Sequence, residues 1–218
     1  MSKLFVVSAP SGTGKTTLNN RLMRDFPIIE IAISHTTRKK REGETEGSSY
    51  HFVTRDYFQT MIRHGELLEW AEVFGNFYGT SRRELDRIFA KQHHALLEID
   101  VQGCQTILRS KPDAITVFIL PPSIEALWHR LEQRGTDSEK ERWKRLVAAK
   151  KEIASGNLYE HFIINDHMER AYGELKSVLI DGKHSQLSKK EGIQLCDKLV
   201  EEFETSPLLQ SLRKKFGH

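Results

Sequence analysis

Short apolar runs alternate with amphipathic segments along most of the chain. Five apolar runs have the length of buried strands, and they span residues 4–7, 28–33, 95–101, 115–120 and 162–164. Apolar residues recur with helical periodicity in further segments, near residues 15–25, 81–91, 102–110, 123–134, 139–155 and 167–180. Alternating strands and helices are typical of an α/β fold with a parallel core sheet flanked by helices. In such folds, ligands bind at the carboxyl ends of the strands.

Residues 34–80 interrupt this alternation and predict a small inserted subdomain of mixed α and β structure. The runs Tyr50–Val53 and Leu67–Val73 have the pattern of antiparallel strands, and a short helix is expected between them at residues 55–64. Two aromatic residues of this segment are expected in the core: Trp70 and Phe74.

Two segments toward the C-terminus have patterns of their own. Residues 130–146 form a charged hinge around Gly135, which suits either a mobile lid or an ordinary helical hairpin. Ser188 and Glu191 have the spacing of a capping box, and Ser206-Pro207 has the composition of a further helix start. The tail therefore predicts two amphipathic helices, docked on the body of the protein or on another subunit.

Composition narrows the class of protein. The chain has 218 residues, enough for one domain with insertions and for a large core without disulfides. Its 33 basic and 30 acidic residues are interspersed and leave a formal net charge of +3, which does not indicate a nucleic-acid partner. The two cysteines lack metal-ligand spacing, and no apolar run approaches the ~20 residues of a membrane span. We expect a cytoplasmic protein with neither a membrane nor a nucleic acid as partner.

A glycine-rich loop follows the first apolar run and precedes the first helical segment. It reads Ser8-Ala9-Pro10-Ser11-Gly12-Thr13-Gly14-Lys15-Thr16-Thr17. In this context the backbone N–H groups of the loop and the start of the helix form a concave site for phosphate oxygens. Lys15 would reach the β- and γ-phosphates of a nucleoside triphosphate, and the Thr16 hydroxyl would bind Mg²⁺. Ala9 replaces the first glycine of the usual motif, and its Cβ disfavours positive φ.

Further motifs lie in and after the inserted segment. The first spans Ser34 to Phe52 and contains Ser34-His35-Thr36-Thr37-Arg38, Arg41, Gly43-Glu44 and Tyr50-His51-Phe52. The others are Glu69-Trp70-Ala71, Asn76-Phe77-Tyr78-Gly79-Thr80, Glu98-Ile99-Asp100-Val101-Gln102-Gly103, Arg134-Gly135-Thr136 and Ile164-Asn165-Asp166. Together with the phosphate loop, this ordered set resembles the bacterial-type guanylate kinases over roughly residues 3–180.

The resemblance implies a P-loop nucleoside monophosphate kinase fold that transfers the γ-phosphate of ATP to GMP, and to dGMP, with Mg²⁺ as cofactor. It also implies a division into domains: a core of 1–33, 85–124 and 155–184, a GMP-binding subdomain of 34–84, a lid of 125–154, and a C-terminal helical extension of 185–218. The oligomeric state stays open between a monomer and a homo-oligomer formed through the C-terminal helices.

Residue chemistry agrees with the acceptor site that the resemblance implies. Arg38 and Arg41 offer planar charged forks for a phosphate, and phenolic donors would come from Tyr50 and Tyr78. A buried carboxylate at Glu69 would accept two N–H donors of guanine and reject adenine. The resemblance adds further substrate contacts, with the last also near the metal through water: Ser34, Thr80, Glu98 and Asp100.

For the donor, the resemblance implies that ATP phosphates bind seven residues of the loop: Ser11, Gly12, Thr13, Gly14, Lys15, Thr16 and Thr17. Asn165 is expected near the adenine. Four residues are expected to stabilise charge on the transferring group and so to be catalytic: Lys15, Arg38, Arg134 and Arg145. Arg130 is a weaker lid candidate.

Two other functions are less consistent with these residues. A non-catalytic guanylate-kinase-like module that binds a phosphorylated peptide is disfavoured by the intact Lys15 and Thr16. A ribose 1,5-bisphosphate kinase of the same lineage is disfavoured by Glu69, which suits a guanine base. Apart from Ala9, the chain departs from the family pattern at Lys39, Lys40 and Glu42, where proline is frequent, and at Arg142, where an aliphatic residue is usual.

Overall fold

The computed structural model describes residues 2–73, 75–133, 135 and 137–217. It divides into two compact units, one of Met1–Val6 with Met23–Ile115 and the other of Val7–Leu22 with Thr116–His218. The first boundary falls within strand β1 (Leu4–Ser8), all of whose residues are buried. The core, subdomain and lid boundaries expected from the sequence differ from this division and stay a prediction.

One sheet consists of parallel strands in the order β2-β7-β1-β8-β9. Strand β2 (Ile29–Ile31) pairs in parallel with β7 (His94–Glu98), and β8 (Ile115–Leu120) pairs in parallel with β9 (His161–Ile164). These strands coincide with the apolar runs of the sequence to within one residue, except that β2 and β7 end before their runs do, at Ile31 and Glu98. The predicted α/β class with a parallel sheet is confirmed.

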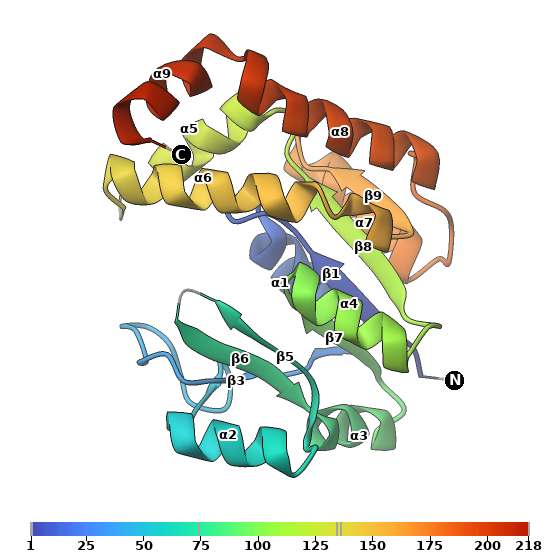
Figure 1. The fold of residues 1–218 in the computed structure, drawn as a ribbon. Helices are drawn as coiled ribbons and strands as arrows, with labels where there is room; N and C mark the ends of the chain where they lie inside the picture. The colour runs from blue at the N-terminus through green and yellow to red at the C-terminus, as the bar shows by residue number, and fades with distance from the viewer. Residues whose placement is uncertain (1, 74, 134, 136, 218) are drawn as a thin grey trace. The chain divides into compact units, whose positions relative to one another are not determined.

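Helices lie between and after the strands of this sheet along the chain (Figure 1). In the first unit they are α3 (Arg82–Ala90) and α4 (Val101–Ser110). In the second unit they are α1 (Lys15–Asp25), α5 (Ile124–Gln133), α6 (Glu139–Ile153), the short η1 (Gly156–Leu158) and α7 (Met168–Leu179). Side-chain oxygens accept N–H groups at the starts of three of them, from the capping residues Ser81, Asp100 and Ser138.

The inserted segment forms a second sheet with the strand order β4-β3-β6-β5. Its strands are β3 (His35–Thr36), β4 (His51–Phe52), β5 (Leu67–Val73) and β6 (Asn76–Ser81). Helix α2 (Arg55–Arg63) lies along one face of this sheet (Figure 1). The side chains that join them form one apolar cluster: Phe58, Met61, Leu67 and Phe77.

Two expectations for this segment were wrong. Strand β4 is not antiparallel, because a long loop returns the chain so that β4 runs parallel to the two-residue strand β3, which the sequence did not reveal. Trp70 is not in the core but 42% exposed. A bulge between Leu67 and Glu69 shifts the alternation of β5, so that Glu69 is buried and Trp70 faces outward. Phe74 lies outside the described residues.

The C-terminal segment forms the two predicted helices, α8 (Lys189–Thr205) and α9 (Pro207–Phe216), and both pack against α6. The indole N–H of Trp143 donates to the Gly217 carbonyl oxygen over 3.0 Å. Glu204 pairs with two cations, Lys150 on α6 and Arg213 on α9. The tail therefore docks on α5 and α6 of its own chain.

Arg142, the unusual residue of α6, is packed within the α5–α6 pair. Its guanidinium lies 5.1 Å from the centroid of the Trp128 ring, and its side chain is only 15% exposed. The long arginine stem therefore fills the place of an aliphatic residue while its charge rests on an aromatic face. Among the described residues, no helix has both the length and the apolar character that crossing a membrane requires.

Candidate active site

The glycine-rich loop between β1 and α1 has a conformation that depends on two of its glycines. Gly12 and Gly14 have φ angles of +97° and +96°, in the region that side chains other than glycine rarely adopt. Among the described residues the only non-glycine with positive φ is Gln92, so Ala9 has an ordinary backbone conformation. The first position of the motif therefore does not need glycine in this chain.

Asn165, which follows β9, holds this loop in place. Its side-chain amide donates to the Thr13 carbonyl oxygen over 2.6 Å, and Asn165 is 3% exposed. A Cβ on Gly14 would lie 2.6 Å from the same amide nitrogen, so glycine is also needed there for space. From the sequence, Asn165 is expected near the adenine, which stays a prediction; the structure shows its amide on the backbone of the glycine-rich loop.

Arg145 on α6 also reaches the loop. Its guanidinium lies 3.5 Å from the Ser11 hydroxyl oxygen and 3.2 Å from a carboxylate oxygen of Asp137. Of the two lid arginines predicted to be catalytic, Arg145 is therefore beside the phosphate loop, whereas Arg134 lies outside the described residues.

The first turn of α1 brings Lys15, Thr16 and Thr17 to the end of the loop. The N–H groups of a first helical turn point out of the helix and favour an anion there. Within the described ranges, no group of three His, Cys, Asp or Glu side chains could hold a metal ion. Thr16, on the first turn of α1, is exposed.

In the first unit, a cationic fork stands in the long loop after β3. The two terminal nitrogens of Arg38 donate to both carboxylate oxygens of Glu44, over 3.0 and 2.6 Å. The backbone N–H of Arg41 donates to the same carboxylate over 2.8 Å. Hydrogen bonding to Glu44 raises the pKa of Arg38 further. The Glu44 carboxylate thus occupies both terminal nitrogens of the Arg38 fork.

Two phenols adjoin this fork. The rings of Tyr50 and Tyr78 meet edge to face with centroids 5.9 Å apart, and the Arg38 guanidinium lies 5.5 Å from the Tyr50 ring. Burial, together with the neighbouring Tyr78, raises the pKa of Tyr50. Tyr50 therefore stays protonated at neutral pH and is able to donate to an anion.

Glu69, Thr80 and Ser34 form a buried polar group on the same sheet. The Thr80 N–H donates to Glu69 Oε1 over 2.8 Å, and the hydroxyls of Thr80 and Ser34 lie 3.0 Å apart. Glu69 is 4% exposed, and this burial raises its pKa to about 7. The group thus combines a carboxylate with hydroxyls, which suits a flat ligand with several N–H donors.

Asp100 and Glu98 lie at the carboxyl end of β7. Asp100 caps α4, where one carboxylate oxygen accepts the Gly103 N–H over 2.9 Å. The Asp100 charge also contributes to the raised pKa of Glu69. Glu98 is the last residue of β7 and is half-buried. The structure therefore brings the Asp100 charge close enough to act on Glu69. The role of Asp100 near the monophosphate and the metal stays a prediction.

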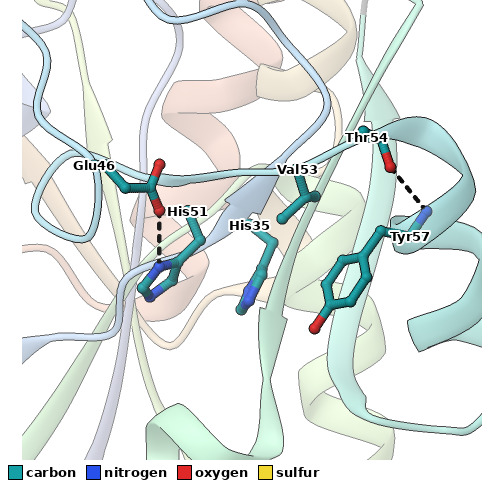
Figure 2. A pocket seen from close by; sticks show the side chains of 6 residues that line it. All are labelled: His35, Glu46, His51, Val53, Thr54 and Tyr57. Atoms are coloured by element: carbon teal, nitrogen blue, oxygen red, sulfur yellow. Dashed lines mark hydrogen bonds and ion pairs between the residues drawn. The ribbon is translucent and has the colours of Figure 1, made fainter.

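Figure 2 shows a pocket of about 450 Å³ that contains none of the predicted site residues and is lined by His35, Glu46, His51, Val53, Thr54 and Tyr57. His35 and His51 are register partners whose ring centroids lie 4.7 Å apart. Side chains alternate along a strand, so His35 points to the face of β3 opposite to Ser34 and Thr36. This pocket is separate from the buried polar group.

Sequence reasoning missed two carboxylates. Glu44 was part of the motif but received no role, because nothing local shows that it would meet Arg38. Glu84, on α3, received no role either; it accepts the Ile33 N–H over 3.2 Å and pairs with Arg87. It thereby holds the backbone next to Ser34, and only a helix-to-strand contact reveals this.

Comparison with known proteins identifies the family. The guanylate kinase family model matches residues 1–182. The guanylate kinase of Myxococcus xanthus (strain DK1622) is 47% identical over 178 residues, which cover 81% of this chain and 85% of the relative. That of Pseudomonas fluorescens (strain Pf0-1) is 43% identical over 199 residues, covering 91% of this chain and 95% of the relative. This second match is long enough to extend into α8.

Comparison with solved structures indicates the same family. The crystal structure of guanylate kinase from Anaplasma phagocytophilum has a TM-score of 0.69 and 32% sequence identity, and the match covers 94% of this chain and 95% of that chain. The chain belongs to the guanylate kinase family.

Proposed function

We propose that this protein transfers the γ-phosphate of ATP to GMP, and to dGMP, giving ADP and GDP. The observation that best supports this reaction is the buried Glu69 carboxylate, held by the Thr80 N–H within the unit that also holds the Arg38 fork. The first group suits a guanine base and the second a monophosphate. Neither a peptide-binding module nor a sugar-phosphate kinase needs a buried carboxylate for a base.

The donor side of the proposed site is the phosphate loop with α1. The positive-φ glycines leave a concave backbone there, and Lys15 would neutralise charge on the β- and γ-phosphates. Thr16 would hold Mg²⁺, which when bound supplies further charge neutralisation on those phosphates. Arg145 stands beside Ser11 and would stabilise the transferring group.

In the proposed reaction, an oxygen of the GMP phosphate attacks the γ-phosphorus of ATP. The bond between the γ-phosphorus and the bridging oxygen breaks, and its electron pair leaves with ADP. The protein contributes positioning and charge rather than a covalent intermediate. Arg38 and the two phenols would hold the attacking phosphate, and Glu69 would hold its base.

The test is ADP formation by the full chain with Mg-ATP and one acceptor at a time. The acceptors are GMP, dGMP, AMP, CMP, dTMP and ribose 1,5-bisphosphate, with an assay lacking acceptor as blank. We expect GMP and dGMP to exceed every other acceptor in kcat/KM by at least about 10²-fold. The absence of GMP-dependent ADP would refute the enzyme, and a preference for ribose 1,5-bisphosphate would reassign it.

Replacing Arg38 by lysine should raise KM for GMP by about tenfold or more and leave KM for ATP within about twofold. Lysine keeps the charge but loses the planar fork that Arg38 now presents to Glu44. The matched control is Arg63→Lys on the exposed face of α2. Equal KM values for GMP in Arg38→Lys and the wild type would remove Arg38 from the phosphate site.

GMP affinity should depend on pH through Glu69. Burial raises the pKa of Glu69 to about 7, and only the ionised carboxylate accepts both guanine donors. The dissociation constant for GMP is therefore expected to be about tenfold higher at pH 6 than at pH 8, as measured by titration calorimetry. The Glu69→Gln variant controls for protonation of the GMP phosphate. An undiminished pH dependence in that variant would contradict the assignment.

A further inference from the structure

Gly103, in the first turn of α4, has a backbone conformation that does not require glycine. Its φ is not among the positive values of the chain's glycines, so its conformation is open to other residues. Glycine is less favourable than alanine inside a helix. The N–H of Gly103 donates to the capping residue Asp100, which an alanine at this position would also do. The reason for glycine must therefore lie in the space around it.

That space is occupied by the carboxylate of Glu69. Helix α4 packs against β5, and a Cβ on Gly103 would lie 2.7 Å from Glu69 Oε2. This is closer than a methyl carbon and an oxygen normally approach. Two atoms of Ile99 would lie at 3.2 Å. Glu69 and Ile99 are both buried, so neither is able to turn into solvent to make room.

The carboxylate is thus held from two sides. The Thr80 N–H binds Oε1 over 2.8 Å, and the bare backbone of α4 borders Oε2. A methyl group at position 103 would push Oε2 away from α4 and tilt the carboxylate about its bond to Thr80. Such a displacement of the carboxylate weakens its hydrogen bonds to a ligand, because its two oxygens must accept two N–H donors of that ligand at the same time.

We propose that Gly103 is a positioning residue for base recognition: its missing side chain leaves the space in which the Glu69 carboxylate takes the orientation that guanine requires. This proposal rests on the proposed role of Glu69 in binding GMP. Gly103 touches no substrate and acts through Glu69, so it determines base specificity without belonging to the reacting centre.

The test compares Gly103→Ala with a matched substitution, Gly173→Ala. Gly173 is also helical, within α7, but nothing lies within 4 Å of a Cβ built there. We expect Gly103→Ala to raise KM for GMP at least about tenfold, with kcat and KM for ATP within about twofold. The preference for GMP over IMP, which lacks the 2-amino group, should fall. Gly173→Ala should change none of these quantities.

A stability cycle separates the contact from the reaction. In the wild-type background, Gly103→Ala should lower the urea midpoint, whereas in a Glu69→Ala background it should raise the midpoint, as Gly173→Ala does. This cycle measures unfolding only, so it reports on the contact even if the wild type proves not to phosphorylate GMP. If Gly103→Ala does not fold but the double variant does, the clash with Glu69 is equally established.

Three results would overturn the proposal. One is an unchanged KM for GMP and an unchanged GMP-to-IMP preference in folded Gly103→Ala. Another is an equal fall of the urea midpoint in both backgrounds, which would assign the contact to Ile99 instead of Glu69. The third is failure of both the single and the double variant to fold.

Discussion

The Glu69→Gln variant is expected to raise KM for GMP by about 10²-fold while leaving KM for ATP within about twofold. Glutamine keeps the shape of the side chain and an oxygen for the Thr80 N–H, which now binds Glu69 Oε1 over 2.8 Å. It replaces the other carboxylate oxygen by an amide NH₂. This group is itself a donor, so it is unable to accept a hydrogen bond from a guanine N–H. The loss is therefore confined to base recognition.

The same variant should make the empty protein more stable at alkaline pH. Burial raises the pKa of Glu69 from its ordinary 4.5 to about 7. The folded state therefore binds more protons than the unfolded state between these values, and the free energy of unfolding falls as pH rises through that window. Above pH 7 the buried, ionised carboxylate lowers the free energy of unfolding by up to about 3 kcal/mol. The neutral glutamine has no such effect.

Urea unfolding at pH 5 and pH 8 and steady-state kinetics at pH 8 measure both effects. The midpoints of Glu69→Gln and the wild type should nearly coincide at pH 5 and separate at pH 8, with the variant higher. The control is Glu72→Gln, the same change at an exposed position of the same strand. Proportional losses for GMP and ATP would show that Glu69 supports the fold rather than the base.

The Lys15→Ala variant is expected to lower kcat by about 10²–10³-fold with the fold retained. Lys15 is the first residue of α1 and directly follows Gly14, whose φ of +96° shapes the loop. An ammonium group at this place meets negative charge that grows on the phosphates during transfer. Alanine is a better helix former and leaves the loop glycines unchanged, so the loss should be in the reaction alone.

Single-turnover kinetics with saturating ATP and GMP measure the transfer step, and titration with GMP alone measures the acceptor site. GMP binding should be unchanged, because Lys15 belongs to the second unit, whereas Arg38 and Glu69 belong to the first. Lys198→Ala, at an exposed position of α8, is the matched control. A kcat for Lys15→Ala within about threefold of the wild type would rule out its role in stabilising the transferring phosphate.

The candidate site was predictable where a motif carries its own geometry. The phosphate loop is contiguous, so its strand, glycines and helix start are visible in the 14 consecutive residues 4–17. The acceptor site is spread over several strands, and only its resemblance to a known family joined Arg38, Glu69 and Thr80. The contacts of Glu44 and Glu84 were not predicted, because loop closure and helix packing determine their partners and leave no periodic pattern in the sequence.

Sequence alone determined the order of the strands and helices apart from the two-residue strand β3, because apolar periodicity and helix caps are local properties of the chain. Tertiary structure decided what those elements expose. A single bulge in β5 leaves Trp70 exposed and Glu69 buried. The long loop between β3 and β4 brings β4 beside β3 in a parallel orientation. The raised pKa of Glu69 and the empty space at Gly103 likewise exist only because α4 packs on β5. Burial is a property of neighbours distant in the chain, so composition and spacing do not contain it.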